Sequence, residues 1–527
     1  MRCSLLIITF ISSMTSSRGY ARASAEESSR PSSAVSSRSI DQAGNSRSRP
    51  LPSRAAALVF ALALATAIGS WAQEPAAPVS AAPAADAPSA DPAAQLEAKR
   101  RDTIRYGIDS EISDLVRVLT SEKDGRYDDE LLDLFGSSRS PKLRATVLEF
   151  FATLEWNGAE KAALGMVEDR DNQDVDLVDS ALLYLAAIRS KDALRFSDAL
   201  MKENNKKLLP ALVRLMGRSG GEPEEALLLG WFDSDSTSPA LKEEAIKALG
   251  EIGSAKAAER LGRLVQDVTA GKAARMFACD ALAKIKDGSS VDSLVKASND
   301  QDPNVRTSAI QALGSFAEGA GAPGAAARRA IAEALRDSFP NARVAACKAA
   351  ASGKVAQALP FLRYKAQSDP ELAVRSEACR SLAILGAASI GLGSSGEDDP
   401  FAFLRGIVDD KEADGALRVL CFGLLARYDP AGSLPALEAR LAAEASEKDR
   451  TFYTALAREV ANADKAPGIG ALARALLADK EYLIRIAGIE WIRKNKAAGL
   501  RPDLELLARS DPSEMIKKRA AEALKAF

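Results

Sequence analysis

The chain has 527 residues, of which 47% are hydrophobic, 5% aromatic and 27% charged, and 70 Lys and Arg against 72 Asp and Glu leave a net charge of −2. A single core normally stops growing at about 250–300 residues, so this length predicts several domains or one repeat array. Nucleic-acid binders usually carry a basic surplus, which is missing here. The absence of histidine excludes Ser-His-Asp and Cys-His catalysis and His-ligated metal centres.

The beginning of the chain has the features of an export signal. Residues 1–53 are rich in Ser and Arg, and we predict that they are disordered or an extension before the true start of the protein. An apolar stretch at 54–72 follows a basic flank and ends in small residues, which is typical of a cleaved signal peptide. An uncleaved anchor and a buried helix are the alternatives. The Pro- and Ala-rich residues 73–95 are predicted to be a linker.

These segments predict a periplasmic or secreted protein with no stable membrane span after signal cleavage. Beyond the linker, one apolar stripe predicts a single opening helix that covers the exposed end of the folded region. The stripe consists of Ile104, Ile108, Ile112, Leu115, Val116 and Leu119.

Residues 96–527 repeat themselves. The segments 304–313 and 373–382 read NVRTSAIQAL and AVRSEACRSL, and related strings recur at intervals of roughly 30 to 45 residues. Each string predicts the second helix of a helical pair, and a Pro before it in several units suits the first turn of that helix. The insertions Glu318–Gly324 and Ala387–Asp398 are expected to form loops.

These units resemble the HEAT-repeat family, in particular the short bacterial type also found in phycobilisome-lyase-like proteins. The matching residues are Asp302, Pro303, Val305, Arg306, Ala309, Ile310, Ala312, Leu313 and Gly314. The resemblance implies an all-α fold, a right-handed α-α superhelix of about twelve units. It also implies a ladder in which the Arg of one second helix meets the Asp-containing turn of a neighbouring unit. Because this Asp and Arg recur in most units, we interpret them as structural and not catalytic.

Four of the five cysteines lie in the repeats. Cys279, Cys347 and Cys379 occupy the place that Ile310 takes in its unit, and Cys421 lies one residue earlier in its own. Neighbouring helices pack about 8–10 Å apart, whereas a disulfide needs Cα atoms within about 7 Å. We therefore predict four reduced, buried thiols and no metal site.

Two further patterns point weakly to ligands. The acidic tract 168–176 suggests calcium, but the sixth and twelfth places of an EF-hand loop would be Asp174 and Ser180 where Gly and Glu are needed. Gly391–Gly396 has spacing close to a dinucleotide-binding loop, but a predicted helix precedes it and Glu397 and further acids follow. We interpret the first as a turn between helices and the second as a flexible loop.

No catalytic, cofactor-binding or metal-binding residue is predicted, and Trp156, Trp231 and Trp491 are interpreted as core or groove-lining residues. The leading hypothesis is a non-catalytic scaffold that binds a protein partner on the concave surface of its second helices, most directly along 240–390. No nucleic-acid partner is expected. A lyase or enzyme accessory, by resemblance to HEAT-like lyases that attach bilin pigments, is the alternative, and an envelope spacer is a third hypothesis.

Overall fold

The computed structural model describes residues 92–389 and 399–527, which belong to one compact unit. Within these ranges all regular structure is helical, with 26 α-helices in thirteen consecutive pairs and no strand. The predicted all-α, HEAT-like solenoid is confirmed. The predictions for residues 1–53, 54–72 and most of 73–95, and for Gly391–Gly396, concern residues outside the described ranges.

The first helices of the pairs are α1 (Pro92–Tyr106), α3 (Asp128–Ser137), α5 (Glu160–Glu168), α7 (Ser197–Glu203), α9 (Glu222–Asp233), α11 (Ala255–Gln266), α13 (Val291–Ala297), α15 (Gly321–Ala334), α17 (Leu359–Ser368), α19 (Pro400–Asp409), α21 (Pro430–Ala445), α23 (Ile469–Leu477) and α25 (Arg501–Ser510). The second helices are α2 (Asp109–Glu122), α4 (Pro141–Leu154), α6 (Val175–Ala187), α8 (Leu209–Ser219), α10 (Pro239–Ile252), α12 (Lys272–Ile285), α14 (Pro303–Gly314), α16 (Pro340–Ser352), α18 (Leu372–Ser389), α20 (Gly415–Tyr428), α22 (Thr451–Asn462), α24 (Tyr482–Asn495) and α26 (Glu514–Leu524). Six short 3-10 helices occur between them: η1 (Gly125–Tyr127), η2 (Arg170–Asn172), η3 (Asp192–Phe196), η4 (Gly288–Ser290), η5 (Ala356–Ala358) and η6 (Ala498–Leu500).

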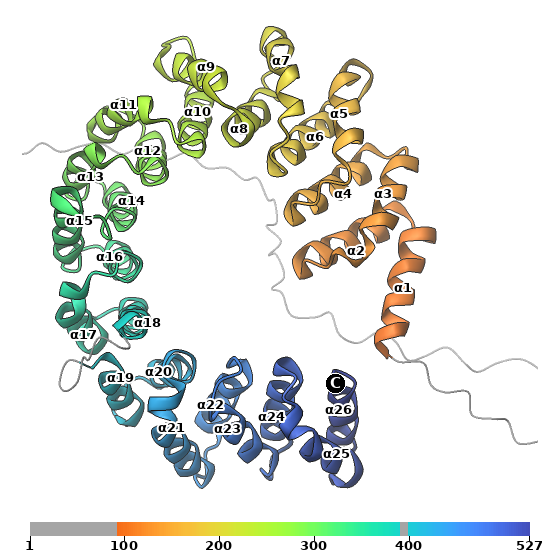
Figure 1. The fold of residues 1–527 in the computed structure, drawn as a ribbon, viewed down its shortest axis with the longest axis vertical. Coiled ribbons are helices and arrows are strands. Elements are labelled where there is room, and N and C mark those ends of the chain that lie inside the picture. The colour runs from red at the N-terminus through yellow and green to blue at the C-terminus, as the bar shows by residue number, and fades with distance from the viewer. Residues whose placement is uncertain (1–91, 390–398) are drawn as a thin grey trace, which may run out of the picture. The chain divides into compact units, whose positions relative to one another are not determined.

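The helices of the unit form two layers. Figure 1 shows the even-numbered second helices on the inner side of the curved array and the odd-numbered first helices on its outer side. Each second helix packs against its own first helix and against the second helices before and after it, as α10 does with α9, α8 and α12. A helical pair cannot bury its own apolar stripe, so each unit depends on its neighbours for a core. Within the described ranges, none of the helices has the length and apolarity that crossing a membrane requires.

The second helices begin where the repeat predicts. Pro303 is the first residue of α14, where its missing N–H costs nothing. The Asp302 carboxylate caps this end by accepting a hydrogen bond from the Asn304 N–H at 2.8 Å. Two turns further on, Ile310 and Leu313 are fully buried, in a helix that packs against the neighbouring second helices and α13. The recurring spacing within each unit therefore encodes both the start of a helix and its buried face.

Small residues allow the second helices to approach one another closely. A Cβ atom on Gly217 would lie 2.7 Å from the Cα of Ala248, and a Cβ on Gly250 would lie 2.7 Å from the Cα of Ala281. These distances are too short for any side chain unless the helices separate. Glycine is required at both places because the opposing atoms belong to backbone.

The prediction of a single opening helix is wrong, because the apolar stripe is divided between α1 and α2. A side chain at Gly107 would lie 2.6 Å from the carbonyl oxygen of Thr103, so glycine ends α1 here without a clash. Ile104 and Ile112 are each 3% exposed, but Ile108 lies between the helices and is 66% exposed. The periodicity continues across the break because both helices face the same core.

Three other boundaries differ from the sequence-based expectation. Helix α15 starts at Gly321, so only the first part of the insertion Glu318–Gly324 is a loop. Helix α18 continues through Ser389 and takes in the start of the insertion Ala387–Asp398. Helix α1 starts at Pro92, inside the predicted linker. All three segments are rich in Ala, which extends helices beyond the point where the repeat pattern ends.

The four cysteines of the repeats are free and fully buried, as predicted. Burial raises the pKa of the Cys279 thiol to about 12, and the pKa of the Cys347 thiol to about 12. Two of the thiols lie closer together than expected, because a hydrogen bond joins the side chains of Cys421 and Cys379. This hydrogen bond is the main cause of the raised pKa of Cys421.

These thiols are expected to resist alkylation in the native protein. The thiolate is the reacting species, and the raised pKa values of Cys279 and Cys347 predict reaction with iodoacetamide at pH 8 about a thousandfold slower than that of an exposed thiol. Mass mapping of the alkylated peptides checks this, with the same reaction in concentrated urea as the control. Rapid labelling of either cysteine in the folded chain would contradict the predicted burial.

Candidate binding surface

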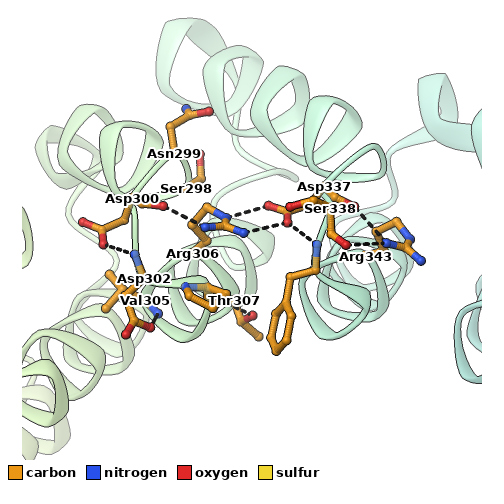
Figure 2. A network of polar contacts seen from close by, with 12 residues as sticks. Ser298, Asn299, Asp300, Asp302, Val305, Arg306, Thr307, Asp337, Ser338 and Arg343 are labelled. Carbon is orange, nitrogen blue, oxygen red and sulfur yellow. Dashed lines mark hydrogen bonds and ion pairs between the residues drawn. The ribbon is translucent and has the colours of Figure 1, made fainter. Parts of the chain in front are cut away.

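In several units, the recurring Arg of the second helix connects two turns of the array. Figure 2 shows Arg306 of α14, whose Nε and Nη2 donate to the two carboxylate oxygens of Asp337, before α16, at 2.8 and 2.9 Å. Its Nη1 donates to the backbone carbonyls of Asp300 and Gln301 in its own turn, at 2.9 and 3.2 Å. One guanidinium therefore fixes the turn of its own unit and the turn of the next.

The same ion pair recurs along the array, and we call the series the ladder and each Arg–Asp pair a rung. Further rungs join Arg275 to Asp300, Arg343 to Asp369 and Arg485 to Asp511. In the Arg343 rung, Nε and Nη2 each donate to a carboxylate oxygen of Asp369 at 2.8 Å. The ladder implied by the resemblance is thus present in these units.

The charge state of the ladder fits a structural role. The side chain of Asp369 is 0% exposed and that of Arg343 is 8% exposed. Burial alone would raise the pKa of Asp369, but hydrogen bonds from Arg343, from the Glu371 N–H and from Lys365 together hold it below its usual value. This carboxylate remains charged and its oxygens are occupied by donors of the chain itself, which leaves it unsuited to substrate or metal binding.

The acidic tract at 168–176 lies at the turn between α5 and α6, as expected. The Asp169 carboxylate accepts hydrogen bonds from the side-chain amides of Asn172 and Gln173, at 2.7 and 3.0 Å. Asp174 caps α6 and accepts from the Asp176 N–H at 2.9 Å. In the part of the chain that the structure describes, no group of three or more acidic or Cys side chains is placed to hold a metal ion.

The three tryptophans of the repeats do not form a common site. Trp491 in α24 is 2% exposed and belongs to the core, as predicted. Trp156 and Trp231 are half-buried and pack against the core from different units. The carbonyl oxygen of Trp156 accepts a hydrogen bond from the buried Tyr184 hydroxyl at 2.9 Å, which ties it to α6.

The exposed side of the second helices is the candidate binding surface. In five consecutive units, the positions five and nine residues after the basic residue of the repeat are exposed or half-buried on the inner layer (Figure 1). We call these positions the inner row. It consists of Lys247 and Glu251 on α10, Asp280 and Lys284 on α12, Gln311 on α14 and Ser315 directly after it, Lys348 and Ser352 on α16, and Arg380 and Ile384 on α18.

In the first half of the inner row, the charges neutralise one another. The ammonium group of Lys284 lies 3.0 Å from the carboxylate of Glu251 and 2.7 Å from that of Asp280. Lys247 similarly lies 2.9 Å from Glu244 on its own helix. A partner would gain little from these groups, because each already has an oppositely charged neighbour.

In the second half, over α14, α16 and α18, the inner row offers groups that a partner can use. Lys348 makes no ion pair with any residue in the described ranges, and Arg380 pairs only with Glu377 on its own helix, at 3.3 Å. Ile384 is an apolar side chain that is 38% exposed. Gln311 adds a neutral polar group on α14. This half therefore favours a segment that carries acidic and apolar side chains.

Reasoning from the sequence placed the surface on the second helices but named no residue in it. Counting five and nine residues forward from each basic residue would have found the inner row, because these positions follow one another on one helix face. The sequence did not show which charges of the inner row form ion pairs, because the paired Glu251 and Lys284 come from different units.

The repeats match a known protein family over most of the chain. The family described as Spirochaete HEAT repeat protein matches residues 104–523. No curated protein matches the chain. Among solved structures, the karyopherin Kap121p bound to Pho4p is 13% identical, with 83% of this chain and 52% of that chain covered and a TM-score of 0.41. The complex of CpcE and CpcF of phycocyanin lyase from Nostoc sp. PCC7120 is 20% identical, with 45% of this chain and 87% of that chain covered and a TM-score of 0.28. The chain spans about half the length of Kap121p.

Proposed function

Because the chain belongs to the Spirochaete HEAT repeat protein family, we propose that it is a non-catalytic scaffold that binds a protein partner along its inner row. The observation that supports this proposal is the second half of the row. There Lys348, which has no ion pair within the described ranges, a locally paired Arg380 and an exposed Ile384 follow one another on adjacent helices. Exposed groups of this kind, in a repeated arrangement on the inner layer, suit an elongated partner segment.

The spacing of the helices sets the size of that segment. Neighbouring helices pack about 8–10 Å apart, so the three second helices α14, α16 and α18 span roughly 20 Å. A partner helix rises about 1.5 Å per residue, so roughly 13 residues would cover this distance. We expect a partner segment that places two acidic side chains opposite Lys348 and Arg380 and an apolar one opposite Ile384.

Charge reversal on the inner row is expected to abolish partner binding. The double variant Lys348→Glu with Arg380→Glu places like charges opposite the partner's acids, and we expect at least about a hundredfold loss of affinity. The measurement is quantitative capture of the partner by the full-length chain. The control is Arg329→Glu, which reverses an exposed charge on α15 in the outer layer. Unchanged capture by the double variant would refute the proposal, and a coloured pigment on the purified protein would support the lyase alternative.

We further propose that the protein acts outside the cytoplasm. The support is the sequence of residues 54–72, in which a basic flank, an apolar stretch and small residues follow one another. We expect the mature protein in the periplasmic or secreted fraction to start near Gln73, and N-terminal sequencing with intact mass measurement checks this. A mature protein that retains residues 54–72 would contradict cleavage.

A further inference from the structure

One rung of the ladder is open, between α18 and α20. Arg375 of α18 donates from its Nη1 to the backbone carbonyls of Asp369 and Pro370 at 2.8 and 3.3 Å, as Arg306 does in its own turn. In Arg306 the remaining nitrogens, Nε and Nη2, reach the Asp of the next unit. Arg375 makes no ion pair with any residue among 92–389 and 399–527. Its guanidinium is therefore held in place with the carboxylate-binding side unused.

The expected acceptor of this rung is Asp410, in the turn between α19 and α20. Its carboxylate accepts a hydrogen bond from the Glu412 N–H at 2.9 Å. Asp337 makes the same turn in the closed rung, where it accepts from the Phe339 N–H at 2.7 Å. Both halves of the Arg375 rung thus have the local conformation of a closed rung, but the two charged groups lie more than an ion-pair distance apart.

A cavity of about 690 Å³ lies between the two halves and is lined by both Arg375 and Asp410. Phe403 and Ile407 of α19 and Leu417 of α20 form its apolar side. The volume falls within the range of about 300–1,000 Å³ that small-molecule sites occupy. A pocket of this size with a fixed charged group at one end has the features of a binding site for a small polar ligand.

The charges around the cavity select the ligand. The planar fork of a guanidinium binds a carboxylate in two parallel hydrogen bonds, and the closed rungs show this geometry within the same protein. Asp410, Glu412 and Asp414 all line the cavity, so three carboxylates face one guanidinium. Asp414 is partly occupied, because it caps α20 by accepting from the Ala416 N–H at 2.9 Å. The three carboxylates would repel a ligand that carries only negative charge. A ligand that carries only positive charge would leave Arg375 without a counter-charge.

We propose that this cavity binds a zwitterionic ligand of the amino-acid type, with its carboxylate on the Nε–Nη2 fork of Arg375 and its ammonium group facing Asp410. The apolar side chain of the ligand lies against Phe403 and Ile407. A free amino acid and a dipeptide share this chemistry. The site lies at the turns of the array and not on the inner row, so it is independent of the proposed partner surface.

Calorimetric titration of the full-length protein with L-leucine and with the dipeptide alanyl-leucine tests the proposal. We expect at least one of them to bind with a dissociation constant of about 1 mM or lower. L-leucine amide lacks the carboxylate and N-acetyl-L-leucine lacks the ammonium group, so each should bind at least about tenfold more weakly than L-leucine if the free amino acid is the ligand. Preference for the dipeptide over the amino acid would identify a peptide as the source of the ligand.

Variants assign the binding to the cavity. Arg375→Gln and Arg375→Lys, which both remove the fork, and Asp410→Asn, on an exposed turn, should each weaken binding about tenfold or more, while Arg329→Gln on α15 should leave it unchanged. Absence of binding by both probes at about 10 mM would overturn the proposal. Equal binding of L-leucine and its amide would do the same. So would an energetic coupling between Arg375 and Asp410 in unliganded protein, because it would mean that the rung closes by itself.

Discussion

Replacement of Asp369 by Ala is expected to destabilise the array by about 3–5 kcal/mol, the cost of breaking a buried ion pair from one side. The substitution leaves the Nε and Nη2 of Arg343 without acceptors, although that side chain is only 8% exposed. It also removes the acceptor of the Lys365 ammonium group, 3.1 Å away, and of the Glu371 N–H. A buried guanidinium and a half-buried ammonium group then lose their shared counter-charge.

The loss is expected to appear first around α16, α17 and α18, because the units of a repeat array unfold partly independently. Urea denaturation gives its total size, and hydrogen exchange of these three helices gives its location. The matched control is Glu318→Ala, which breaks an exposed ion pair with Lys354 (3.0 Å, side chains 52% and 66% exposed) and should cost no more than about 1 kcal/mol. Equal effects of the two variants would show that the ladder does not hold the units together.

Replacement of Gly250 by Leu is expected to destabilise the contact between α10 and α12 by about 1–3 kcal/mol, and by more if the helices cannot separate. A Cβ at this position would lie 2.7 Å from the Cα of Ala281 and 2.9 Å from its Cβ. Leu is a better helix former than Gly, so helix propensity alone would change stability in the opposite direction. The sign of the effect therefore separates packing between units from propensity within one helix.

The same substitution at Gly230 is the control for this effect. Gly230 lies on α9 in the outer layer, and a Cβ there would have nothing within 4 Å. Gly230→Leu should therefore stabilise the chain by roughly 0.5–1 kcal/mol, because it relieves the entropic cost of Gly in a helix. Urea denaturation of the two variants beside the unchanged chain measures both values. A stabilising Gly250→Leu variant would mean that α10 and α12 do not pack as closely as the structure shows.

Much of the fold follows from local patterns in the sequence. The spacing of Asp302 and Pro303 predicted the turn and the helix start, because each of these depends on a few adjacent residues. The ion pair of Arg306 to the next unit was implied by the resemblance to HEAT repeats. The burial of Cys347 and Cys379 followed in the same way from their place in the repeat. The family match over 104–523 confirms the resemblance that these residues suggested.

Features that depend on the distance between units did not follow from the sequence. Arg375 and Asp410 have the same sequence context as residues of closed rungs, yet in the described part of the chain they form no ion pair and line a cavity together. The division of the opening stripe at Gly107 was missed because apolar periodicity alone does not distinguish one helix from two that share a core. To find the part of the inner row that is open to a partner, one must know which exposed charges already form ion pairs with the next unit.

Site-specific photo-crosslinking tests the proposed binding surface most directly. A photoreactive amino acid is placed at Gln311 or Ser352 on the inner row, or at the exposed outer positions Ala325 or Arg329 of α15, in the full-length chain. We predict covalent adducts with one and the same protein from the two inner positions and none from the outer ones. Adducts of equal yield from both layers, or adducts from the outer positions alone, would contradict a partner surface on the second helices.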